Sequence, residues 1–77
     1  MTDAESRGLK LIPANVRQAH PRAQVQSLRR IATRALNTAD RAVEYSNDHA
    51  EAAKLRAKAA DALAAMQWLN TEHKLGY

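Results

Sequence analysis

Several residue types are rare or absent in this sequence. It has no cysteine and no phenylalanine, and only two glycines, two prolines and three aromatic residues in 77 positions. Disulfides and thiolate metal sites are therefore excluded, and two glycines cannot build a glycine-rich phosphate loop. No apolar run approaches the roughly 20 residues of a membrane-spanning helix. Residues 1–13 also lack the basic start and apolar stretch of a signal peptide, so we expect a soluble, cytoplasmic protein.

Residues that could carry chemistry are equally sparse. The three histidines, His20, His49 and His73, are far apart in the sequence and form no spacing typical of a metal site. No serine lies near a histidine–carboxylate pattern that would activate it as a nucleophile. We therefore predict no catalytic residue, no metal site and no cofactor, and we expect that the protein is not an enzyme.

Alanine is abundant, with 17 residues, and it indicates an all-α fold. We predict one long helix over residues 22–45 and a second over residues 49–74. The polar run Ser46–Asp48 separates them, which is typical of a turn between two helices. The predicted fold is an antiparallel helical hairpin, and one continuous helix with a kink is the alternative.

The N-terminal part is predicted to be less regular. We expect residues 1–8 to be flexible, and residues 9–77 to form a single helical domain. Within it, residues 9–20 would form an extended hook followed by a short helix that begins at Pro13 and ends near Ala19, because Pro21 disfavours helical geometry at His20. A domain of this size has a small core, so oligomerisation or a bound partner would support it.

Each long helix carries apolar residues at helical spacing. On the first helix these residues fall three or four positions apart and include Leu36 at the margin of the face. On the second helix the residues expected to face the first are Ala52, Leu55, Ala59, Ala62, Leu63, Met66 and Leu69. A second row of the same helix remains uncovered: Ala53, Ala57, Ala60, Ala64 and Trp68. Either residues 9–16 fold back over this row, or it is the interface with another protomer or a partner, with Trp68 as the anchor.

Positive charge is concentrated in the first half of the chain. Residues 1–34 contain seven Arg and Lys residues against two acidic ones, while the remainder is close to neutral. The candidate residues for an anion or an acidic partner are Arg22, Arg29, Arg30 and Arg34. Arg30 and Arg34 lie one helical turn apart, so both could reach one anion. The alternative is a solvated face whose arginines form ion pairs along the helix surface.

Two hypotheses of function follow. The first is a non-enzymatic helical interaction protein that self-associates and binds or blocks a partner protein with an acidic surface. The second is an anion-binding module for nucleic acid or a phosphorylated nucleotide, acting through the arginines of the first long helix. No membrane partner is expected.

In its size, its basic N-terminal half and its polar turn between two helices, the chain resembles the small helical proteins with which bacteriophages take over the host or disarm its defences. The resemblance implies an inhibitor acting in the cytoplasm of a bacterial host. It assigns no residue a role.

Overall fold

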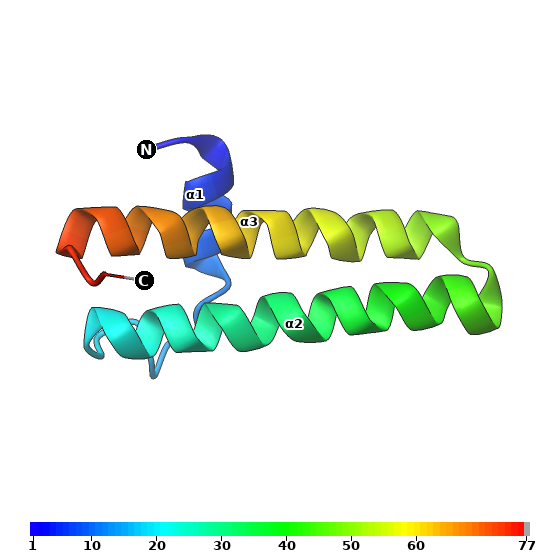
Figure 1. Ribbon diagram of the computed structural model, residues 1–77, viewed down its shortest axis with the longest axis horizontal. Coiled ribbons are helices and arrows are strands. Elements are labelled where there is room, and N and C mark those ends of the chain that lie inside the picture. The colour runs from blue at the N-terminus through cyan, green and yellow to red at the C-terminus, as the bar shows by residue number, and fades with distance from the viewer. Residues whose placement is uncertain (77) are drawn as a thin grey trace.

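Two long helices make up most of the molecule. The computed structural model describes residues 1–76, which form α1 (Asp3–Lys10), α2 (Pro21–Ser46) and α3 (His49–His73), without any strand in that range. α2 and α3 lie side by side along the long axis, and α1 crosses α3 (Figure 1). The all-α prediction is confirmed, and the two long helices begin and end within one residue of the predicted positions. No helix in the described part of the chain is long and apolar enough to cross a membrane.

Local signals fix the ends of the long helices. The His20 side chain accepts a hydrogen bond from the backbone N–H of Arg22, and Pro21 fits the first turn because it has no N–H to satisfy. Asn47 ends α2 in the left-handed conformation, with φ of 51°. The Asp48 carboxylate then accepts a hydrogen bond from the Glu51 N–H at 3.0 Å and caps α3. The chain is therefore broken at residues 47 and 48, and the alternative of one kinked helix is wrong.

The prediction for the first eight residues is wrong, because they belong largely to α1. Thr2 caps this helix: its hydroxyl accepts from the Glu5 N–H, and the Glu5 carboxylate accepts from the Thr2 N–H at 2.6 Å. These hydrogen bonds, chiefly the one from the Thr2 backbone, lower the pKa of Glu5. Two residues after Glu5, Arg7 donates two hydrogen bonds to the Asp61 carboxylate of α3, at 3.0 and 3.2 Å, and this contact raises the pKa of Arg7.

Gly8 sets how closely α1 approaches α3. A Cβ atom built on Gly8 would collide with the backbone carbonyl oxygen of Asp61 and would lie 2.7 Å from the Cβ of Ala65. Gly8 is itself buried. Only a residue without a side chain allows the two helix backbones to approach this closely.

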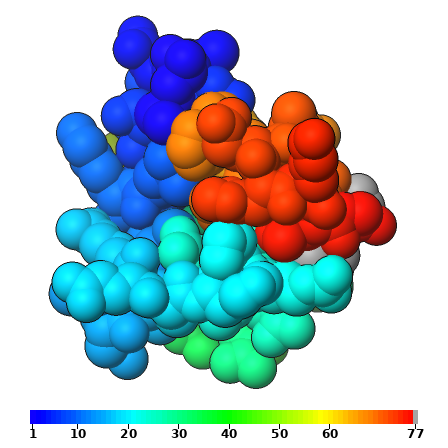
Figure 2. All heavy atoms as spheres, turned by 90° about the vertical axis from the view of Figure 1, so that its left-hand side faces the viewer, coloured from blue at the N-terminus to red at the C-terminus, as the bar shows by residue number. Residues whose placement is uncertain are grey.

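The segment between α1 and α2 contains turns, and the short helix predicted from Pro13 is absent. The extended hook predicted before it is also wrong, because Leu9 and Lys10 belong to α1 and Leu11 has helical backbone angles. Arg17 holds the segment together by donating to the carbonyls of Lys10 and Ile12 at 2.9 and 3.0 Å. Gln24 of α2 donates to the carbonyls of Arg17 and Ala19. The segment packs on the helices, because Ile12 belongs to the buried core and Leu11 and Val16 lie against it. Viewed along the long axis, the N-terminal part of the chain covers one flank of the two long helices, and the end of the described chain lies on the other (Figure 2).

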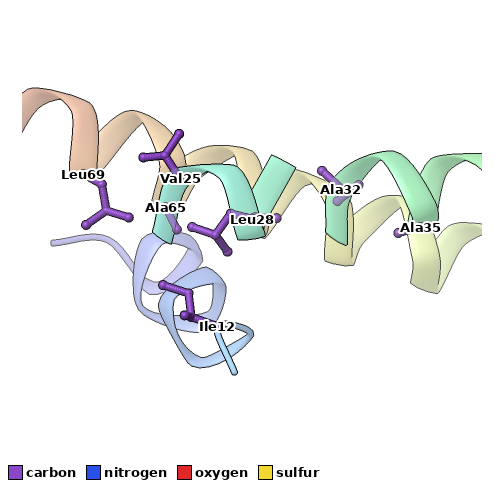
Figure 3. Packing of buried hydrophobic residues seen from close by; sticks show 9 residues of the cluster. Ile12, Val25, Leu28, Ala32, Ala35, Ala65 and Leu69 are labelled. Atoms are coloured by element: carbon purple, nitrogen blue, oxygen red, sulfur yellow. The ribbon is translucent and has the colours of Figure 1, made fainter. Parts of the chain in front are cut away.

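The core is narrow because alanine dominates it. Seven of the eleven buried hydrophobic residues in the described chain are alanines, and the only large side chains exposed by less than 2% are Leu28 and Val25. Ile12 lies among residues of both long helices (Figure 3). Two predicted members of the interface between the helices lie at its margin, since Leu36 is 41% exposed and Leu63 is 47% exposed. Alanine brings the helix axes close together and leaves little interior for larger side chains.

Candidate anion-binding groove

A groove of about 340 Å³ runs between α2 and α3. It adjoins the segment between α1 and α2, because Ser27 and Arg30 also border a depression beside Val16 and Ala19. The groove is lined by Ser27, Arg30, Ile31, Arg34, Ala35 and Thr38 of α2 and by Leu55 and Lys58 of α3. Its volume is at the lower end of the range of ligand-binding clefts.

The groove combines an apolar floor with a cationic rim. Ala35 is buried and Ile31 and Leu55 are partly buried, whereas Arg30, Arg34 and Lys58 are exposed. Arg30 and Arg34 lie one turn apart on α2, with Cβ atoms about 5–6 Å from each other. Lys58 comes from α3. Two guanidinium groups and an ammonium group therefore border one cavity, with no acidic residue in its described lining.

The rim cations form no ion pair within the described chain, and Asp61, three residues from Lys58, is engaged by Arg7. The positions three and four residues from Arg30 and Arg34 on α2 are neutral or basic, so the helix offers neither arginine an acidic partner. Within the described chain the ion pairs are Arg7–Asp61 and the 3.6 Å pair of Arg56 with Asp40, and neither involves the rim. Arg30 and Arg34 are exposed, as on a solvated face, but the ion pairs expected along the helix surface are absent for both within the described chain.

A second depression continues the positive surface around α2. It has a volume of about 460 Å³ and shares Arg30, Arg34 and Thr38 with the groove. Its other basic residues are Arg29 and Arg41, and no acidic side chain occurs in its described lining. Three of the four predicted arginines thus lie at these two connected cavities.

Arg22 is the exception among the predicted arginines. It lies in the first turn of α2, where its backbone N–H donates to His20, and it lines neither cavity. Sequence reasoning also missed Lys58 and the floor residue Ile31. Both residues line the cavity only because α2 packs against α3, and the spacing along a single helix does not show this.

The alanine row predicted as an interface is divided by the fold. Ala53, Ala57 and Ala60 are exposed, whereas Ala64 is partly buried. Trp68 is also partly buried and packs against the core of its own chain. Trp68 therefore contributes to the core of the monomer, and the exposed part of the row is its three-alanine portion.

The described residues contain no group of three His, Cys, Asp or Glu side chains arranged to hold a metal ion. Comparison of the sequence with family models, curated proteins and solved structures found no match.

Proposed function

We propose that the protein is a non-catalytic helical module that binds an acidic surface of a partner protein through the groove between α2 and α3. The observation that carries the proposal is the set of unpaired cations, Arg30, Arg34 and Lys58, around one apolar-floored cavity. Arginine is suited to this role because its planar fork donates two parallel hydrogen bonds to one carboxylate. Occupation of a partner's surface would block other ligands of that surface, which is the mode of action that the phage resemblance implies.

The proposal takes α2 and α3 as an antiparallel hairpin. The two-residue connection at Asn47 and Asp48 and the Arg56–Asp40 ion pair near that end support this arrangement. It brings Lys58 opposite the middle of α2, so that the positive charge comes from both walls of the groove.

Binding of poly-L-glutamate, measured by calorimetry at low and moderate salt, tests the electrostatic part of the proposal. We expect the double variant Arg30→Gln, Arg34→Gln to weaken binding by about 2- to 30-fold, which corresponds to two exposed ion pairs. The matched control is Lys10→Gln, Arg56→Gln, which removes the same net charge away from the groove. Equal losses in the two variants would show that only net charge matters and would refute the groove as the site.

Self-association is the second candidate, and the exposure of Ala53, Ala57 and Ala60 beside the half-exposed Leu63 favours it. Small residues permit a second helix to approach closely along this face. Trp68→Ala would disturb the core, so Ala60→Glu is the better test, with Ala23→Glu on α2 as its control. We expect light scattering to give a lower mass for Ala60→Glu alone. A monomeric mass for the unmodified protein would reject self-association.

A further inference from the structure

On the side of α2 and α3 where the groove lies, a segment of the same chain covers part of the helix pair. Ile12, from the segment between α1 and α2, is only 2% exposed and belongs to the same buried cluster as Leu28 of α2 and Ala65 and Leu69 of α3 (Figure 3). An apolar side chain presented from outside α2 and α3 is thus accommodated between them.

Beyond Ser27 and Arg30 the chain leaves this flank uncovered. The groove begins there and extends to Thr38, a span of about 16 Å at the rise of an α-helix. Its floor continues the apolar surface with Ile31, Ala35 and Leu55. The segment between α1 and α2 therefore covers the helix pair near the start of α2. No segment of the described chain covers it along the groove.

The charged rim of the groove indicates which charge a bound partner would carry. Arg30 and Arg34 border the groove from α2 and Lys58 borders it from α3, and no acidic side chain in the described lining compensates them. A partner placed on the apolar floor would have to bring carboxylates on both sides of its apolar stripe. That is the pattern of an amphipathic acidic helix.

We propose that the groove binds one amphipathic acidic helix of a partner protein. Its apolar stripe would contact the partly buried Ile31 and Leu55, and its flanking carboxylates would pair with Arg30, Arg34 and Lys58. About three helical turns would fit the open length. This inference rests on the proposed function and adds the conformation and patterning of the acidic partner.

Nucleic acid fits the same groove less well. Single-strand binders add aromatic side chains on which bases stack, and the described lining contains no aromatic residue. A phosphate backbone would also leave the apolar floor without a complementary surface.

Three probes of equal net charge distinguish the possibilities by fluorescence anisotropy. The first is a synthetic peptide about 20 residues long, with leucines at helical spacing and glutamates on both sides. The second has the same composition with the leucines dispersed, and the third is a single-stranded oligodeoxynucleotide. We expect the patterned peptide to bind at least about tenfold more tightly than either of the others, since burial of one leucine contributes about that factor.

A variant with a negative charge in the groove tests whether the patterned peptide binds there. Thr38 is exposed, so Thr38→Glu adds a negative charge to the lining without disturbing the core. We expect it to weaken binding of the patterned peptide about 2- to 5-fold. Thr71→Glu, at an exposed position near the end of α3, is the control and should have no effect.

The possible binding results distinguish this inference from the proposed function. Equal binding of the two peptides, with Arg30→Gln, Arg34→Gln still weakening both, overturns the helix but leaves the proposed function standing. Tightest binding of the oligonucleotide overturns the inference in favour of nucleic acid. Binding that is unaffected by both the arginine and the Thr38 variants overturns the inference and the proposed function together.

Discussion

Replacement of Gly8 by alanine tests whether close contact between α1 and α3 holds the N-terminal helix in place. The added Cβ would collide with the Asp61 carbonyl oxygen and lie 2.7 Å from the Ala65 Cβ. A backbone carbonyl of a packed helix cannot rotate away, so α1 must shift. Overpacking of this kind costs about 1–3 kcal/mol, and a clash with backbone belongs in the upper part of that range.

Helix propensity acts in the opposite direction. Alanine is favoured over glycine within a helix by about 0.5–1 kcal/mol, which reduces the expected loss in unfolding free energy to about 1–2.5 kcal/mol. For a domain of this size that loss lowers Tm by about 4–20 °C, measurable by far-UV circular dichroism. The control is Ala53→Gly on exposed α3 surface, where propensity alone predicts a loss of about 0.5–1 kcal/mol. Unchanged or higher stability of Gly8→Ala would refute the close contact.

Three further predictions concern other parts of the fold. Leu28→Ala should lower the unfolding free energy by about 2–5 kcal/mol in a urea titration, because Leu28 is fully buried in a narrow core. Asn47→Gly should leave stability unchanged or slightly higher, whereas Asn47→Val should lower it by about 1–2 kcal/mol, because φ is 51° there. Glu5 has a lowered pKa in the folded protein. Its contribution to folding stability is therefore present above its ordinary pKa of 4.5 and is lost as the pH falls through its pKa in the folded protein. Glu5→Gln should flatten this acid-induced loss of stability, followed by thermal unfolding at pH values on both sides of 4.5.

The long helices could be predicted because their signals are local. The apolar spacing of residues 22–45, the proline before them and the polar residues at the turn each depend on neighbours in sequence. The bounds of α2 and α3 accordingly differ from the predicted ones by no more than a residue.

α1 was missed for a physical reason. Its capping box at Thr2 and Glu5 is readable in the sequence, but a helix of eight residues is unstable in isolation. Its position depends on Gly8 against Asp61 and on the Arg7–Asp61 ion pair, contacts that join residues more than 50 positions apart. A glycine that ends a flexible segment and a glycine that permits close helix packing look the same in a sequence.

The candidate site, like the fold, could be predicted where its signal lies within one helix. The spacing of Arg30 and Arg34 was enough to suggest a shared anion, because one helix determines it. The contribution of Lys58 depends on the rotation of α3, and α3 has apolar residues around much of its circumference. The spacing did predict that Ala52, Ala59, Ala62 and Leu69 face α2, and these residues are buried. It did not show that Lys58 lies at the edge of that face, beside a cavity lined by both helices.

In the proposed function, the cations around the groove would act on non-specific association as well as on the choice of partner. An uncovered apolar strip between two helices favours association with any apolar surface. Three unpaired positive charges oppose that association for neutral or basic surfaces, since those surfaces would bury the charges without a partner. An acidic amphipathic surface removes this penalty by supplying carboxylates. In the proposed function, the same residues would thus disfavour most contacts and favour one class of partner surface.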